Sequence, residues 1–90
     1  MIIQVVGRTH VNYVNKENKT VQGYQIYGIV IDDDYYTPDL EGHTVFDAYI
    51  SCATLSLVPE IDNHYRVIKQ RSRDSEGKEY DRYIDLKELS

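Results

Sequence analysis

The chain has 90 residues, of which 41% are hydrophobic and 28% charged, and its formal net charge is −5 at pH 7. This length predicts one domain over residues 1–90, and the apolar content suffices for a core, which argues against wholesale disorder. The single cysteine excludes an intramolecular disulfide framework and a multi-cysteine zinc site. Neither a signal peptide nor a membrane-spanning apolar run is recognisable, so we expect a cytoplasmic protein without a cofactor.

The first third of the chain predicts a long hairpin. The chain contains nine tyrosines, and Tyr, Val and Ile favour strands because they pack well on a pleated surface. Residues 2–6 predict a strand that continues to Val14, with a bend or bulge at Gly7. The polar run 15–19 predicts the hairpin tip, and the alternation over 20–31 is the clearest strand pattern in the chain.

The middle of the chain is acidic and less regular. Residues 32–42 predict a long loop that is punctuated by Pro38 and Gly42. Residues 43–52 predict a third strand. Residues 53–57 predict either a short helical turn or a continuation of that strand, and Pro59 excludes regular helix beyond it.

The last third predicts a second hairpin. Residues 64–71 and 79–86 predict a fourth and a fifth strand, and the polar run 72–78 joins them. Five strands with mostly local connections and no long helix predict an all-β fold. We expect a small five-stranded antiparallel barrel of the oligonucleotide-binding type, closed or half-closed, because a barrel removes exposed strand edges.

Charge is segregated along the chain. Residues 1–31 carry a net charge of +2, residues 32–63 a net charge of −8 and residues 64–90 a net charge of +1. Within the last block, residues 64–73 carry four positive charges and no negative one. Phosphates are attracted by a local basic groove rather than by a basic total, because salt screens charge over roughly 10 Å at 0.1 M.

Basic residues and tyrosines share the same stretches, which favours binding of single-stranded nucleic acid, DNA or RNA. Aromatic rings stack on bases while Lys and Arg follow the backbone. The alternative is structural, since tyrosines also fill β cores and mixed charge protects strand edges. The candidate binding residues are Lys16, Lys19, Tyr24, Tyr27, Arg66, Arg71 and Arg73.

Five segments together resemble the gene V type single-stranded DNA-binding proteins of filamentous phages. The start MIIQV is similar to the family's first strand, and TVQGYQIY over 20–27 is similar to its Gly- and Tyr-bearing strand beside the DNA-binding wing. Residues 42–46 resemble the strand after the family's central loop, and 65–68 and 83–86 resemble its last hairpin. The likeness is one of layout, and the acidic block 32–63 departs from it.

The resemblance implies a dimeric oligonucleotide-binding barrel that coats single strands cooperatively, without sequence preference, in replication of a phage or mobile element. It implies that Lys16, Lys19, Tyr24 and Tyr27 lie on the binding wing. It also implies that the 72–78 tip contacts a dimer partner or a neighbouring molecule.

The acidic block supports a second hypothesis, in which the chain is a protein-interaction module or a nucleic-acid mimic that binds a basic protein partner. Tyrosines are enriched in interface hot spots, so the 32–41 loop is the candidate surface. Its candidate residues are Asp32, Asp33, Asp34, Tyr35 and Tyr36.

Catalytic and metal-binding motifs are not recognisable. The acidic loop does not have the spacing of a calcium-binding EF-hand, so we predict no metal site. Cys52 has no nucleophile signature, and we expect it to be a buried structural residue of the third strand. We therefore predict a binding protein rather than an enzyme.

Overall fold

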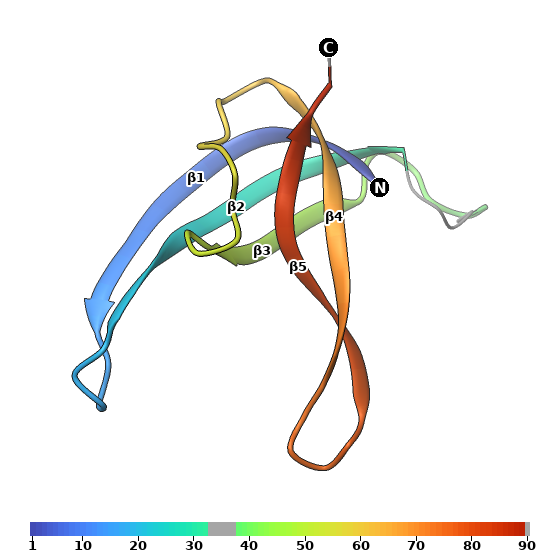
Figure 1. The fold of residues 1–90 in the computed structure, drawn as a ribbon. Coiled ribbons are helices and arrows are strands. Elements are labelled where there is room, and N and C mark those ends of the chain that lie inside the picture. The colour runs from blue at the N-terminus through green and yellow to red at the C-terminus, as the bar shows by residue number, and fades with distance from the viewer. Residues whose placement is uncertain (33–37, 90) are drawn as a thin grey trace.

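The computed structural model describes residues 1–32 and 38–89, which form five strands and no helix (Figure 1). This confirms the predicted all-β fold. The 53–57 segment holds only a hydrogen-bonded turn, in which the Ser51 carbonyl accepts from the amides of Thr54 and Leu55 at 3.1 and 2.9 Å. The strands are β1 (Ile2–Val14), β2 (Thr20–Asp32), β3 (Val45–Ser51), β4 (His64–Arg73) and β5 (Glu79–Glu88).

The strands form one antiparallel sheet in the order β3-β2-β1-β4-β5. β1 joins its two halves, because it pairs with β2 along its whole length and with β4 through Ile2–Gln4. A register shift between Val5 and Gly7 marks the predicted bulge. Bulges bend a strand and increase its twist, so the sheet curls and brings β3 towards β5.

The curled sheet does not close. No backbone pairing joins β3 to β5 among the described residues, although the rings of Phe46 and Tyr83 meet across the seam at 5.1 Å and an interplanar angle of 70°. The topology is that of an oligonucleotide-binding barrel with one open seam. The half-closed form of the predicted barrel is therefore the observed one.

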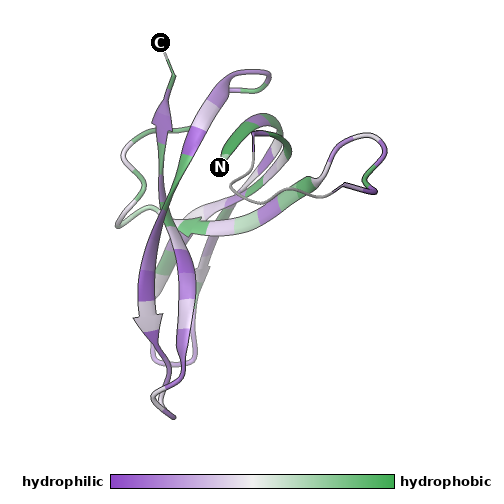
Figure 2. Cartoon of the chain, turned by 90° about the vertical axis from the view of Figure 1, so that its right-hand side faces the viewer, coloured by the Kyte–Doolittle hydropathy of each residue, from purple (hydrophilic) through white to green (hydrophobic). Residues whose placement is uncertain are grey.

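The core lies inside the curl and draws on all five strands. Full burial of an aliphatic or aromatic side chain contributes roughly 1.5–3 kcal/mol each, so this small cluster is the main stabilising element. Figure 2 shows the hydrophobic start of β1 beside the N-terminus, whereas the lower parts of β4 and β5 are mostly hydrophilic. The buried hydrophobic residues that form this cluster are Ile3, Val5, Ile26, Val30, Phe46, Ile50, Tyr65, Val67 and Leu86.

Two hairpins project from this core, and their tips share one design. In the first, the Asn15 amide donates to the Lys19 carbonyl at 2.9 Å, and the Asn15 side-chain oxygen accepts from the backbone amides of Glu17 and Lys19. Asn18 takes the left-handed conformation with φ 60°. The 74–78 tip repeats this arrangement with an aspartate first and a glycine of φ 79° fourth. Both are three-residue loops that require this geometry at the last position.

Candidate nucleic-acid interface

The strand register decides on which side of the sheet each predicted tyrosine lies. Successive side chains of a strand alternate between the two faces. Tyr24 shares the inner face with the buried Ile26, and its ring lies 5.0 Å from that of His10, the residue opposite it on β1. Tyr27 lies on the outer face. The two predicted stacking residues therefore point to opposite sides of β2.

Three tyrosines share the outer face of the β1–β2–β3 part of the sheet: Tyr13 on β1, Tyr27 on β2 and Tyr49 on β3. Their exposed fractions are 54, 42 and 39%. We call this surface the tyrosine face. It presents one aromatic ring from each of three neighbouring strands to the solvent.

Two glycines lie beneath these rings. A methyl group at Gly7 would meet the Tyr27 ring at 3.5 Å, an ordinary contact. A methyl group at Gly23 would overlap the hydroxyl end of the Tyr49 ring, so that ring lies across the sheet directly over the glycine. Glycine here permits the close approach of ring to backbone. Because Gly23 has no side chain, it leaves the space that the Tyr49 ring occupies.

The environment of Tyr49 further disfavours the ionised form of its phenol, which is neutral at pH 7 even at the ordinary pKa of tyrosine. Partial burial raises its pKa, and the neighbouring Tyr13 phenol and Cys52 thiol raise it further because each would add like charge on ionising. A neutral ring does not repel a nucleic-acid phosphate. The side chain can therefore act as a stacking surface and as a hydroxyl donor.

The predicted basic residues fall into three groups. Lys16 and Lys19 lie at the β1–β2 tip, where the Lys19 ammonium is 3.9 Å from the Glu17 carboxylate with both side chains exposed. Arg66 is exposed on the outer face of β4, since its neighbours Tyr65 and Val67 are buried in the core.

Arg71 and Arg73 form the third group and are engaged by acidic residues of β5. Arg71 lies 3.1 Å from Glu79 and 3.8 Å from Asp81, and Arg73 lies 3.2 Å from Glu79. These exposed ion pairs contribute little to stability, about 0–1 kcal/mol each. They nevertheless cancel the local charge, because the two arginines face two acids. They also lie on the inner face of the β4–β5 hairpin, apart from the tyrosine face.

A cleft of about 320 Å³ marks the seam between β3 and β5, and it adds a cation that sequence reasoning missed. Arg82 lines this cleft together with Tyr49. No carboxylate of the described residues forms an ion pair with Arg82. Curling of the sheet therefore brings an arginine of β5 to the border of the tyrosine face. The remaining lining residues are Ser51, Thr54 and Tyr83.

One acidic residue lies within the tyrosine face. Asp47 on β3 is the register partner of Tyr27, and its carboxylate accepts a hydrogen bond from the Gln25 side-chain amide. This charge opposes phosphate binding. The face therefore combines aromatic surface with cations at two of its borders and one carboxylate inside it.

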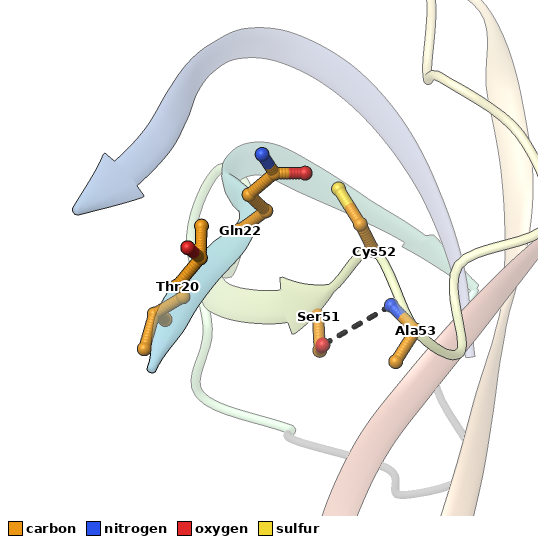
Figure 3. A pocket seen from close by; sticks show the side chains of 6 residues that line it. Thr20, Gln22, Ser51, Cys52 and Ala53 are labelled. Atoms are coloured by element: carbon orange, nitrogen blue, oxygen red, sulfur yellow. Dashed lines mark hydrogen bonds between the residues drawn. The ribbon is translucent and has the colours of Figure 1, made fainter. Parts of the chain in front are cut away.

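Cys52 is exposed, which makes the prediction of a buried cysteine wrong. β3 ends at Ser51, and the chain then turns, so Cys52 does not follow the alternation that would have buried it. Its amide donates to the Gln22 carbonyl at 3.0 Å. Figure 3 shows it in an open groove beside Thr20, Gln22 and Ala53, which belong to the start of β2 and to the turn.

The acidic surface of the second hypothesis is only partly within the structure. Asp32 is exposed at the end of β2, whereas Asp33, Asp34, Tyr35 and Tyr36 lie outside the described residues. Over residues 1–32 and 38–89, no three His, Cys, Asp or Glu side chains gather in a way that could hold a metal ion.

No protein-family model, curated protein or solved structure matches the chain. The resemblance to gene V type proteins therefore stays a prediction. The described part of the chain contains no helix with the length and apolar character needed to cross a membrane.

Proposed function

We propose that this chain binds single-stranded nucleic acid, with DNA as the first candidate, on the tyrosine face. The observation that carries the proposal is the gathering of Tyr13, Tyr27 and Tyr49 on one outer face. In oligonucleotide-binding barrels, the β2–β3 face and the β1–β2 and β4–β5 loops are the surfaces that bind oligonucleotides. The proposed site is a binding surface rather than a catalytic one.

Stacking supplies most of the proposed affinity. Each base stacked on an aromatic ring contributes roughly 1–3 kcal/mol, so three rings give a gross contribution of about 3–9 kcal/mol before the strand is ordered. Stacking is sequence-tolerant because every base has a π-face. We therefore expect weak sequence preference.

Lys16 and Lys19 at the hairpin tip and Arg82 at the seam supply the phosphate contacts. With three contacts, the logarithm of the binding constant should fall with the logarithm of salt concentration at a slope of about −2, since single strands give roughly −0.7 per contact. The net charge of −5 lowers affinity at low salt, where screening is weakest.

The test is a titration of intrinsic tyrosine fluorescence with oligo-dT, repeated at several salt concentrations and with oligo-U. Tyr49→Ala and Tyr27→Ala should each weaken binding by about 5- to 150-fold, the equivalent of one lost stack. Tyr80→Ala is the matched control, because Tyr80 is 46% exposed on β5, outside the tyrosine face. Absence of binding by the folded wild-type protein at low salt would refute the proposal. Tighter binding to oligo-U would assign the ligand to RNA.

A further inference from the structure

The part of β1 that projects from the core has an unpaired backbone edge. β4 pairs with β1 only through Ile2–Gln4. The next residue, Val5, is hydrogen-bonded to the 62–63 segment: its carbonyl accepts from the Asp62 amide at 2.7 Å, and its amide donates to the Asn63 carbonyl at 3.0 Å. Beyond that point, no strand of the described residues pairs with this edge. Figure 1 shows β1 along the outer margin of the β1–β2–β3 part of the sheet.

The register identifies the backbone groups on this edge. At the tip, the Asn15 amide donates to the Lys19 carbonyl, so this pair is a hydrogen-bonded one. Hydrogen-bonded and non-hydrogen-bonded pairs alternate along an antiparallel ladder. The odd-numbered residues from 7 to 15 therefore direct their amide and carbonyl groups towards β2. The even-numbered ones direct theirs to the free edge: Arg8, His10, Asn12 and Val14.

This edge lacks the devices that prevent strand association. Residues 9–14 contain no charged residue, proline or glycine, and Thr, Val and Tyr favour strands. By contrast, six of the ten residues of β5 are charged, and the unpaired stretch of β4 carries Lys69, Arg71 and Arg73. Charged edge strands resist pairing with another chain. The outer edge of β3 faces β5 across the seam, where the rings of Phe46 and Tyr83 meet. Of the strand edges that remain open, the free edge of β1 is therefore the one best suited to a partner.

We propose that a second copy of this chain pairs with the 9–14 edge, antiparallel to it and centred on Val11, so that His10 of each copy lies opposite Asn12 of the other. A two-fold axis there sets the donors of one edge opposite the acceptors of the same edge in the other copy, which is the self-complementarity an isologous interface requires. The edge-to-edge pairing continues the sheet and leaves the tyrosine faces of both copies uncovered. The dimer does not depend on nucleic acid.

Charge complementarity favours a second copy as the occupant. In this register, Lys16 of one copy lies opposite Val6 of the other, which Gly7 and Arg8 follow. The 59–62 segment runs beside those residues, since the Arg8 guanidinium donates to the Pro59 carbonyl. That segment presents Glu60 and Asp62, both exposed, and neither forms an ion pair within the described residues. The tip carries a net charge of +1, and the segment that it meets carries −2, which becomes −1 when the neighbouring Arg8 is counted.

The test compares the oligomeric state of three proteins by sedimentation equilibrium over a range of concentrations. Asn12→Pro removes an edge amide that β2 does not use, whereas Asn12→Ala, the matched control, keeps it. We expect the wild type and Asn12→Ala to dimerise alike. Asn12→Pro should weaken dimerisation about tenfold or more, because symmetry removes the hydrogen bond twice. A wild type that stays monomeric at every concentration, or an Asn12→Pro variant that dimerises like wild type, would overturn the proposal.

If Asn12→Pro fails to fold, exchanging the charges of one predicted ion pair tests the proposed dimer. Glu60→Lys alone and Lys16→Glu alone should each weaken the dimer, and the double variant should recover it; Glu60 is the suitable site because Asp62 has a left-handed backbone with φ 73°. Additive losses in the double variant would contradict the proposed register. The nucleic-acid proposal is tested separately, because a monomeric Asn12→Pro protein that still binds oligo-dT keeps its tyrosine face.

Discussion

Gly23→Ala is the substitution that most directly tests how the tyrosine face is built. The added methyl group would occupy the space in which the end of the Tyr49 ring now lies. The backbone at Gly23 is not in the left-handed region, so alanine fits the strand conformation itself. The expected response is displacement of the Tyr49 ring rather than loss of the strand.

The expected magnitudes separate stability from binding. Replacing glycine by alanine in a compatible conformation stabilises the folded state by about 0.4–1 kcal/mol. Because the displaced Tyr49 ring loses packing, which offsets this gain, the unfolding free energy should change by less than about 1 kcal/mol. Binding of oligo-dT should weaken by about 5- to 150-fold, as for loss of one stacked base. The Tyr49 pKa should fall towards its ordinary value as the ring leaves its partly buried position.

Gly7→Ala is the control on the same face. Its methyl group would meet the Tyr27 ring at an ordinary contact distance of 3.5 Å, so that ring should stay in place and binding should be unchanged. Thermal unfolding, fluorescence titration and NMR titration of the Tyr49 ring measure the three quantities. If Gly23→Ala binds oligo-dT as tightly as Gly7→Ala, Tyr49 is not a stacking residue.

Three further substitutions probe other parts of the molecule. Burial would raise the pKa of Asp85, but hydrogen bonds from the amide and hydroxyl of Ser56 and from the Leu86 amide outweigh it and lower that pKa. The carboxylate therefore stabilises the fold above about pH 4 and loses this effect as pH falls through its lowered pKa. Asp85→Asn should lower the unfolding free energy by about 1–3 kcal/mol at neutral pH and by less in acid, as measured by denaturant unfolding. Asn15→Ala removes the acceptor of two tip hydrogen bonds and should lower the unfolding free energy by about 1 kcal/mol in the same assay, and an unchanged value would contradict this role. Asp47→Asn removes the one acid of the tyrosine face and should tighten oligo-dT binding, whereas weaker binding would place the nucleic acid elsewhere.

Local patterns predicted the strands because strand formation here depends on alternation and turn chemistry. Both hairpin tips were recognisable from their polar runs, and the Gly7 bulge was recognisable from a glycine inside a strand. The left-handed positions, Asn18 and Gly77, are added by the structure. The third strand is shorter than predicted, Val45–Ser51 rather than 43–52. Its end lies where a turn after Ser51 overrides strand propensity, and this also exposes Cys52.

The candidate site was harder to predict because it depends on pairing between distant strands. Alternation alone puts Tyr24 and Tyr27 on opposite faces, so this split was within reach of the sequence. The pairing of Arg71 and Arg73 with β5 could also have been predicted, because a hairpin tip at 74–78 aligns them with acidic residues of β5. Counting the charges of residues 64–73 alone leaves those acidic residues out. The position of Arg82 beside Tyr49 could not be predicted from the sequence, because it depends on the curl of the whole sheet.

The ion pairs on the β4–β5 hairpin change which force should dominate binding. Four positive charges over residues 64–73 suggested an electrostatic groove, yet acids of β5 cancel two of them, and Arg8 is engaged by the Pro59 carbonyl. The tyrosine face keeps three cations at its borders, of which Lys19 lies 3.9 Å from the Glu17 carboxylate, and has one acid, Asp47, within it. A surface with so little net charge cannot bind mainly through phosphates. Under the proposed function, affinity therefore comes mainly from the rings, and we expect a salt slope no steeper than about −2 and a large effect of Tyr49→Ala. A steep salt slope with little effect of the tyrosines would show that the nucleic acid follows another surface.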